Sequence, residues 1–374
     1  MKTVCMEKMC TGCKACLNVC HKNAIDICDE LLHFNAVIDL NKCINCGKCK
    51  QVCPQCNNIL LQKPIYYAQG WINDTRRLES SSGGAALAIM ISFIKDGGFV
   101  CSCEFKNGDF IFSITNNESE ARKYVGSKYV KSNPDRIYSE VLQLLKEGNK
   151  VLFIGLPCQS AAIQNICKQY KEGLYTVDLV CHGTPSPQLL KQYIDEHKIE
   201  WKKIENISFR SKDQFSIYSN RIKILPNRVK DCYSIAFLNC LDYTENCYSC
   251  QYATFNRVSD ITLGDAWGQL ADTVKDGVSL VLCQTEKGKD LIDKANLTLI
   301  DVDIEKIIAA NHQLQFPSIK HPGRKVFFEN ILKGKTFRKA VFKAMPKEFV
   351  KQEIKYRLIK IHLIKDFSRG GGTE

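Results

Sequence analysis

Short apolar segments separated by polar residues predict alternating strands and helices through the middle of the chain. We expect strands at residues 98–103, 110–114, 150–154 and 175–180, and a helix at residues 138–147. Strands that alternate with helices in this way are typical of a mixed α/β domain. The pattern therefore predicts that the middle of the chain folds around a β-sheet covered by helices.

A serine- and glycine-rich stretch, Ser80 to Gly84, runs directly into the apolar segment 85–94 and predicts the start of a helix. Free backbone N–H groups and the positive end of the helix dipole make such a start suitable for binding phosphate. An ordinary helix cap has the same composition, so both interpretations are open. The apolar segment itself is about half as long as a membrane-spanning helix needs to be.

The end of the chain predicts a basic amphipathic helix from Lys347 to Phe367. Its apolar and basic positions recur at helical spacing: Val350, Ile354, Leu358, Ile361 and Ile364, with Lys351, Lys355, Arg357, Lys360 and Lys365 among them. The helix either docks on its own core or contacts a partner or an anionic membrane surface. We expect residues 368–374, which are glycine-rich, to be disordered.

The net charge of +12 is concentrated in this tail. The chain has 37 basic and 35 acidic residues before Lys320, and 15 basic and 5 acidic residues from Lys320 onward. The body therefore gives no electrostatic reason to expect nucleic-acid binding, and it contains no run of interleaved aromatic and basic residues.

Cysteine is the unusual part of an otherwise ordinary globular composition. There are 21 cysteines among 374 residues, and eleven of them lie in the first 56 residues. The chain does not begin with a basic segment followed by an apolar run, so we expect no secretory signal. A reduced cytoplasmic environment and metal ligation explain these cysteines better than disulfides do.

Two runs of four cysteines share the spacing C-x2-C-x2-C-x3-C and form an internal repeat. A cubane of four irons and four sulfides takes three thiolates from one tight loop and the fourth from the other half of the module. We therefore expect one cluster on Cys10, Cys13, Cys16 and Cys53, and the other on Cys43, Cys46, Cys49 and Cys20. The repeat resembles the bacterial two-cluster ferredoxin module, with His21 where that pattern usually has proline.

Other interpretations of these cysteines are weaker. Zinc sites use cysteine pairs, which fit the duplicated order poorly. Cys49, Cys53 and Cys56 also have the C-x3-C-x2-C spacing of radical-SAM sites, but the repeat already uses the first two. Cys5, Cys28 and Cys56 are left over, and we interpret them as small buried hydrophobic residues.

Two of the expected strands lead directly to a cysteine. Strand 150–154 runs toward Cys158 and strand 175–180 runs into Cys181, which would place both thiols at one edge of the sheet, where α/β proteins often build sites. Cys247 and Cys250 add a pair with x2 spacing. A third cluster, a zinc site and separate buried cysteines all remain open.

A further strand is expected after Ser259. It ends in Asp265, which glycine precedes, and in Trp267, a suitable lining for a planar ring system. No G-x-G-x-x-G and no Walker motif occurs anywhere in the sequence, so a Rossmann-type nicotinamide site has no support.

Six short motifs follow the ferredoxin repeat in order: SSGG at 81–84, GSKYV at 126–130, GLPCQ at 155–159, CHGTP at 181–185, FRSK at 209–212 and DITLGDAW at 260–267. Together they resemble the coenzyme F420 hydrogenase/dehydrogenase beta-subunit family, and the resemblance covers about residues 5–320. The fused ferredoxin, the GSKYV motif and the basic tail are more similar to bacterial relatives encoded with polysaccharide-assembly genes than to archaeal deazaflavin enzymes.

The resemblance implies FAD in the body domain with an iron–sulfur cluster near its isoalloxazine ring. The implied ligands of that cluster are Cys158, Cys181, Cys247 and Cys250, and the implied neighbours of the flavin are Ser82, Gly83, Gly84, Ser127, Lys128, Gly264 and Asp265. Lys128 would offset phosphate charge, and Gly83 and Gly84 would let the backbone approach the pyrophosphate. His182 would either relay a proton to the flavin or orient the Cys181 loop through a hydrogen bond.

The expected fold is thus an α+β ferredoxin-like two-cluster module, followed by a mixed α/β flavin-binding domain and a basic C-terminal helix. We place the module at residues 1–58, a linker at 59–78, the two parts of the flavin domain at 79–150 and 151–320, and the tail at 321–374. The second part of the flavin domain would hold the third cluster.

The expected function is that of an iron–sulfur flavoprotein oxidoreductase. It would pass electrons between its ferredoxin-type clusters and a small-molecule substrate or carrier through FAD, because a flavin converts two-electron into one-electron chemistry. Its redox partner would be a protein or a reduced carrier such as ferredoxin or deazaflavin. The alternatives are a non-catalytic electron-transfer subunit and an accessory protein for polysaccharide assembly. In the last case the cytoplasmic protein would contact the inner face of the membrane through its tail.

Overall fold

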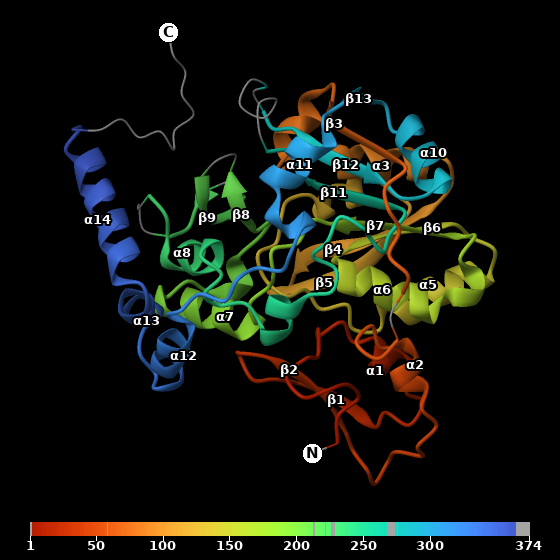
Figure 1. Ribbon diagram of the computed structural model, residues 1–374, viewed down its shortest axis with the longest axis horizontal. Helices are drawn as coiled ribbons and strands as arrows, with labels where there is room; N and C mark the ends of the chain where they lie inside the picture. Colours follow the sequence, from red (N-terminus) through yellow and green to blue (C-terminus); the bar gives the residue numbers. More distant parts are fainter. Residues whose placement is uncertain are drawn as a thin grey trace.

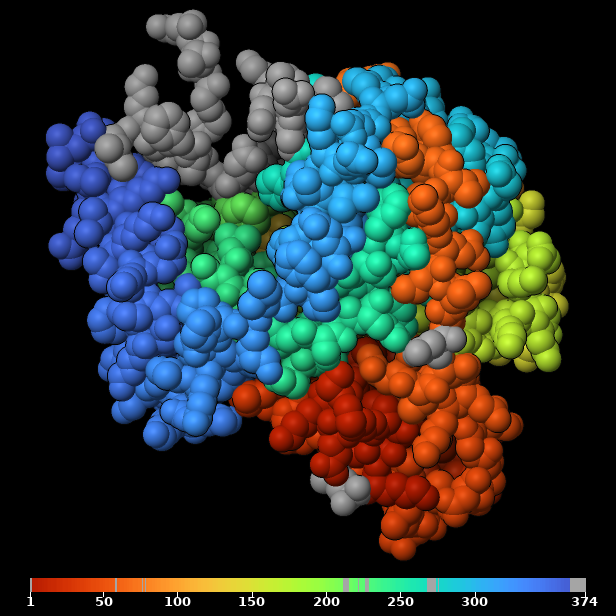
Figure 2. Space-filling model, viewed as in Figure 1, coloured from red at the N-terminus to blue at the C-terminus, as the bar shows by residue number. Residues whose placement is uncertain are grey.

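The computed structural model describes residues 2–57, 59–211, 214–220, 222–225, 229–267, 274 and 276–363 (Figure 1). The N-terminal module consists of α1 (Ala15–Val19), β1 (Ile25–Asp29), β2 (Phe34–Ile38) and α2 (Lys48–Val52), with β1 and β2 paired antiparallel. Figure 2 shows this module, in red and orange, projecting from the body. The ferredoxin-like module predicted from the cysteine repeat is confirmed.

The internal repeat is also visible in the backbone of the module. The residues on either side of the second cysteine of each run adopt positive φ: Gly12 (66°) and Lys14 (59°) in the first run, Asn45 (55°) and Gly47 (75°) in the second. Lys14 and Gly47 cap the starts of α1 and α2. Because this left-handed turn recurs in both runs, each folds its cysteines around a point in the same way.

The body is built on a mixed eight-stranded sheet with the strand order β13-β3-β12-β11-β7-β6-β4-β5. The four central strands β4, β6, β7 and β11 run parallel to one another, and all other pairings in the sheet are antiparallel. The strands are β3 (Tyr66–Ile72), β4 (Phe99–Lys106), β5 (Asp109–Thr115), β6 (Val151–Gly155), β7 (Leu174–Leu179), β11 (Ile261–Asp265), β12 (Ser279–Cys283) and β13 (Leu297–Ile300). The mixed α/β architecture and the strands expected near residues 98–180 are confirmed.

One segment differs from expectation. Residues 59–78, expected to be a linker, contain β3, which lies inside the sheet between β12 and β13. Ala68 and Gln69 of this strand are buried. The strand is stabilised by partners more than 200 residues away in the sequence, so its own pattern carries little signal.

Helices cover both faces of the sheet, and the alternation of side chains along β6 decides which helix packs where. Leu152 and Ile154 pack with α3 (Ala85–Lys95) and α10 (Glu286–Lys294), while Val151 and Phe153 pack with α5 (Ile137–Lys146) and α6 (Pro157–Ile166). Because successive residues of a strand point to opposite faces, β6 is buried on both sides.

A second lobe extends from the β5 edge of the sheet. A single apolar core containing Phe110 of β5 unites its elements, apart from the short strand Ile222–Lys223, which is attached by pairing with residues 218–219. These are α7 (Pro187–Glu196), β8 (Ser208–Ser211), β9 (Gln214–Ser219), β10 (Ile222–Lys223), α8 (Cys232–Leu238), α12 (Arg324–Leu332), α13 (Phe337–Ala344) and α14 (Pro346–Lys360). Two further helices, α4 (Glu118–Ala121) and α11 (Ile304–Ala310), flank the sheet.

A C-terminal helix is present as α14, at one side of the molecule in Figure 1, but it ends at Lys360, before Ile361. Its apolar residues do not gather on one face, so the expectation of an amphipathic helix is wrong. Phe349 is its one buried residue, and Val350 and Ile354 are 44% and 52% exposed. Ile364, Lys365 and residues 368–374 lie outside the described residues. No helix in the described part of the chain is long and apolar enough to cross a membrane. Contact of the tail with a membrane surface stays a prediction.

Candidate functional site

The structure brings the cysteines of the N-terminal module together in the crossed arrangement that the repeat predicts. Cys10, Cys13, Cys16 and Cys53 are all buried, with exposed fractions of 6–8%. Burial raises the pKa of the Cys16 thiol, and the neighbouring charges of Cys13, Cys10 and Cys53 raise it further. Cys53, from the second run, therefore lies beside the three cysteines of the first.

The other four cysteines of the module lie nearer the surface. Cys46 is exposed, and Cys20, Cys43 and Cys49 are half-buried. Burial raises the pKa of Cys49, and the charges of Cys20 and Cys43 add to this effect. Backbone N–H groups donate to these sulfurs, from Ala24 to Cys20 at 3.3 Å and from Asn45 to Cys43 at 3.4 Å.

The three leftover cysteines differ from one another. Cys5 is buried, as expected, and its thiol lies against Cys10 and Cys53. A hydrogen bond from Cys5 is the largest cause that lowers the pKa of Cys53, to about 6. Cys28 is half-buried and Cys56 is exposed, contrary to the expectation that all three are buried. The Cys56 thiol donates to a backbone carbonyl, so its polar group is satisfied at the surface.

Four cysteines of the body also converge. Cys158 lies in the first turn of α6, just after β6, and Cys181 follows β7. Cys247 and Cys250 come from the segment around the short helix Glu245–Ser249. Burial raises the pKa of Cys250 to about 12, and the charges of Cys247 and Cys158 contribute. Burial likewise raises the pKa of Cys181, with contributions from the same two cysteines and from Cys250.

Polar groups point at two of these four sulfurs. The Thr244 hydroxyl lies 3.5 Å from the Cys247 sulfur, and the Asn246 side-chain amide donates to it at 3.7 Å. The Lys131 ammonium donates to the Cys158 sulfur at 3.9 Å. Within the described part of the chain, no group of three or more His, Cys, Asp or Glu side chains is arranged to hold a single metal ion. The four thiols come from different elements and lie close enough for their charges to interact, and a 4Fe-4S cubane takes four thiolates.

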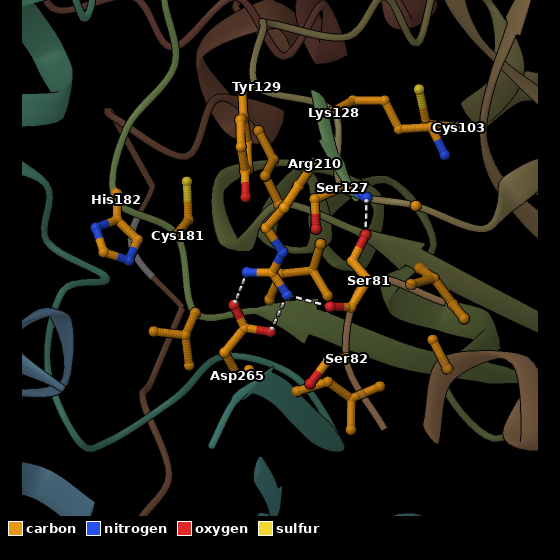
Figure 3. Close-up of a pocket in the computed structure, with 18 of the residues that line it drawn as sticks. Ser81, Ser82, Cys103, Ser127, Lys128, Tyr129, Cys181, His182, Arg210 and Asp265 are labelled. Atoms are coloured by element: carbon orange, nitrogen blue, oxygen red, sulfur yellow. Dashed lines mark hydrogen bonds and ion pairs between the residues drawn. The ribbon is translucent and has the colours of Figure 1, made fainter. Parts of the chain in front are cut away.

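A cavity of about 490 Å³ opens beside the body cysteines, and Cys181 forms part of its wall (Figure 3). Of the expected flavin neighbours, Ser82, Gly84, Ser127, Lys128, Gly264 and Asp265 line it. Gly83 does not: a side chain there would lie 2.4 Å from the Gly70 carbonyl, so this glycine serves the packing of the loop on β3. The volume is typical of small-molecule and cofactor sites.

The serine- and glycine-rich loop is tied to the end of β11 by Arg210. Its guanidinium donates to Asp265 at 2.6 and 3.2 Å and to the Ser81 carbonyl, as Figure 3 shows. The Ser127 backbone N–H donates to the Ser81 hydroxyl at 2.9 Å. Three loops distant in sequence thus form one wall of the cavity.

The first turn of α3 lies against the cavity. Gly84 caps this helix with φ +85° and without a side-chain hydrogen bond, and Ala85, Ala86 and Leu87 line the cavity. The one side-chain contact that the described residues make with these N–H groups is long, from Ala85 to the Ser279 hydroxyl at 3.5 Å. The positive end of the helix therefore faces the cavity with N–H groups available, which is the arrangement that binds phosphate. Of the two interpretations that the sequence leaves open, the geometry favours this one over an ordinary cap.

Two residues have surroundings that the sequence did not indicate. The Lys128 ammonium donates to the carbonyls of Tyr124 and Val125 at 2.6 and 3.1 Å, so two of its hydrogens are used within its own loop. Burial, and to a smaller extent His312, lowers the pKa of His182 to about 4. His182 Nδ1 lies 2.6 Å from the Gln313 side-chain amide nitrogen. The imidazole is thus neutral near pH 7.

Three residues of this region were not among the site residues expected from the sequence: Arg210, Lys131 and Gln313. Arg210 belongs to the FRSK motif, which was a usable signal, although Lys212 of that motif lies outside the described residues. Lys131 directly follows the GSKYV motif. Gln313 comes from the short helix His312–Leu314, and its sequence surroundings carry no comparable signal.

Comparisons with known proteins identify both parts of this architecture. Residues 148–304 match the family model that describes the C-terminal part of the beta subunit of coenzyme F420 hydrogenase/dehydrogenase, and residues 9–57 and 35–102 match two models of 4Fe-4S dicluster domains. A search of curated proteins finds no match. One similar solved chain comes from a xenon-derivatised F420-reducing NiFe hydrogenase complex of Methanosarcina barkeri. It has 17% identity and a TM-score of 0.48, and the match covers 84% of this chain and 97% of that chain. The chain thus joins an N-terminal 4Fe-4S dicluster domain to a segment, residues 148–304, that matches the C-terminal part of the coenzyme F420 hydrogenase/dehydrogenase beta subunit.

Proposed function

We propose that this protein is an iron–sulfur flavoprotein oxidoreductase that carries electrons between its ferredoxin-type clusters and a small organic substrate or carrier through FAD. The proposal rests on the position of Cys181 between two parts of the site. Its thiol belongs to the four-cysteine group of the body and also forms part of the cavity wall. A cluster on these cysteines would lie directly beside a cofactor in the cavity.

The packing of the module supports a fixed order of redox sites. Cys13 of the buried N-terminal group packs with Ala162 and Ile163 of α6, the helix that begins next to Cys158. The other N-terminal group, which consists of Cys20, Cys43, Cys46 and Cys49, lies nearer the protein surface than the group that contains Cys13. The order would be exposed cluster, buried cluster, body cluster and cavity.

A hydrogen bond also links the buried N-terminal group to the body. Gln251, which follows Cys250, donates from its side chain to the Pro54 carbonyl at 2.9 Å, and Pro54 follows Cys53. Cys53 of the buried N-terminal group and Cys250 of the body group are therefore connected by a short backbone path that contains one hydrogen bond. Such a contact holds the two groups at a fixed separation, which electron transfer requires.

The cavity fits FAD in the chemistry of its walls. The N-terminal turn of α3 offers backbone N–H groups for the pyrophosphate. Leu87, Met90, Tyr129 and Phe237 supply apolar and aromatic surface for a ring system. When bound there, FAD would exchange two electrons with a substrate and single electrons with the neighbouring cluster.

His182 serves this chemistry as a neutral group. Because the pKa of its imidazole is near 4, it would accept a proton or a hydrogen bond rather than act as a resident cation. The Gln313 amide beside Nδ1 would orient the ring within the wall of the cavity.

The first experiment measures iron, acid-labile sulfide and flavin in one anaerobic preparation. We expect about twelve irons and one FAD per chain, on four irons per cluster. About eight irons without flavin would contradict the proposal and would leave an electron-transfer subunit with two clusters. If the content is as expected, reduced deazaflavin and reduced ferredoxin are the carriers to test, each by following the flavin absorbance under anaerobic conditions.

A further inference from the structure

Lys131 is buried at the boundary between the N-terminal module and the body. It is 4% exposed, its backbone N–H donates to the Pro185 carbonyl at 3.0 Å, and its ammonium lies 3.9 Å from the Cys158 sulfur. Burying an ammonium group is costly unless a negative charge compensates it. The question is therefore which negative group accompanies Lys131.

Among the described residues, the one polar contact of its side chain is the Cys158 sulfur, and no carboxylate takes that place. The thiols that interact with its charge lie on both sides: Cys158, Cys181 and Cys247 of the body, and Cys13 of the buried N-terminal group. Cys10 of the same N-terminal group also interacts with it. Lys131 thus lies between two sets of cysteines that come from different domains.

We propose that Lys131 supplies a buried positive charge shared by the body cluster and the adjacent ferredoxin cluster, and that this charge raises the reduction potential of both. The inference rests on the proposed function, because it needs a cluster on the body cysteines. Lys131 acts here as a positioning and potential-setting residue, since its contact is with a ligand and not with a substrate.

The direction of the effect follows from electrostatics. Reduction of a cluster by one electron adds one negative charge, and a nearby cation stabilises the reduced form more than the oxidised form. Burial leaves little water to screen this interaction. The effect falls with distance, so the body cluster should respond most and the buried ferredoxin cluster less. The exposed cluster on Cys20, Cys43, Cys46 and Cys49 should not respond.

The test is a redox titration with chemical reductants and mediators, followed by electron paramagnetic resonance, on wild type, Lys131→Met and Lys131→Arg. We expect Lys131→Met to shift the midpoint of the body cluster to more negative potential and to shift the buried ferredoxin cluster less. The exposed cluster serves as an internal standard. Lys131→Arg keeps the charge and should restore most of the shift.

A matched control is Lys287→Met. Unlike the buried Lys131, Lys287 is only partly buried, with its side chain 26% exposed, and its ammonium has a carboxylate partner, Asp260, at 3.6 Å. This variant should leave all three midpoints unchanged. Equal shifts of all three clusters in Lys131→Met, or no shift at all at full iron content, would overturn the inference.

The same samples separate this inference from the proposed function. If wild type contains about eight irons and shows two clusters, the proposed function fails and the Lys131 inference fails with it. If wild type shows three clusters and Lys131→Met does not change their relative potentials, the proposed function stands and the inference alone is wrong. If Lys131→Met loses iron, the midpoint potentials of Lys131→Arg test the inference instead. Wild-type midpoints in this variant support a role for the positive charge, and displaced midpoints contradict it.

Discussion

Arg257 and Asp178 form an ion pair at 2.8 Å that is almost fully buried, with side chains 1% and 0% exposed. Asp178 lies on β7, three residues before Cys181. The Arg257 guanidinium also donates to the Tyr252 carbonyl at 2.5 Å, and Tyr252 lies two residues after Cys250. The pair thus fixes the strand that leads to Cys181 against the loop that carries the other cysteine pair.

Replacing Arg257 with Met should destabilise the fold strongly. Asp178 would keep its buried charge without a partner, which typically costs about 3–5 kcal/mol. Replacing both residues, as in Asp178→Asn with Arg257→Met, should recover much of this loss because no uncompensated charge is left. Chemical denaturation of wild type and of the single and double variants measures the free energy of unfolding.

The matched control for this pair lies at the surface. Lys203 and Glu200 form an ion pair at 2.8 Å with side chains 74% and 68% exposed. Lys203→Met should change the free energy of unfolding by less than about 1 kcal/mol. If Arg257→Met were as mild as this control, the buried pair would not be holding the two segments together.

Replacing Cys53 with Ala tests the crossed arrangement in the N-terminal module. Because Cys53 lies with Cys10, Cys13 and Cys16, the variant should lose the buried cluster and about four irons per chain. The exposed cluster should remain and should still be the first that a chelator removes. Loss of the exposed cluster, with retention of the buried one, would show that each run holds its own cluster. Iron analysis and a chelation time course distinguish these results.

Replacing Arg210 with Met tests how the cavity holds its cofactor. Arg210 joins Asp265 to the loop that contains Ser81, so its loss should loosen one wall of the cavity. Hydrogen bonds to charged groups are worth about 1.5–3 kcal/mol, and we expect the Kd for FAD to rise roughly tenfold or more. Quenching of FAD fluorescence on titration into flavin-free protein measures this constant.

The control for Arg210 is Arg122. It pairs with Glu79 at 3.0 Å near the same loop, but its side chain is 46% exposed and does not line the cavity. Arg122→Met should leave the Kd for FAD unchanged. An unchanged Kd in Arg210→Met would mean that the loop keeps its shape without the guanidinium.

How much of this site could be predicted depends on how local its signal is. The expected N-terminal ligands lie close together in the sequence: Cys10, Cys13 and Cys16 fall within seven residues, so their spacing alone indicates a cluster. For the body cysteines, strand ends and the x2 spacing of Cys247 and Cys250 left a third cluster as one of three interpretations, because Cys158 and Cys250 are far apart in the sequence, and the family resemblance was needed to favour it. Their meeting depends on the order of strands β6, β7 and β11 in the sheet.

Buried charges were the least predictable part. In the sequence, Lys131 and Arg257 are ordinary basic residues in a chain with 52 of them. Their roles depend on the groups that the fold packs around them, and no periodicity records those groups. Strand β3 was missed for a related reason, since Gln69 and Gly70 in its middle interrupt the apolar pattern of a buried strand.

Asp242 is a buried carboxylate of a different kind. It is 0% exposed, and neither of its oxygens has a hydrogen-bond partner among the described residues. Burial raises the pKa of this carboxyl group to about 7, and Arg324 opposes the shift. The folded protein therefore keeps a proton on Asp242 at a pH where the unfolded chain, with a pKa of about 3.9, has lost it.

Replacing Asp242 with Asn should change how stability depends on pH. Between the unfolded pKa and pH 7 the folded state binds one proton more than the unfolded state, so wild type loses stability as pH rises and levels off above pH 7. From about pH 5.5 to 8 this loss should be about 2 kcal/mol relative to Asp242→Asn, which lacks the titrating group. Denaturation curves at several pH values measure the difference. The control is Asp303→Asn, which alters an exposed carboxylate at the start of α11. Its plot of unfolding free energy against pH should run parallel to that of wild type. Parallel curves for Asp242→Asn would mean that a group outside the described contacts stabilises the ionised carboxylate.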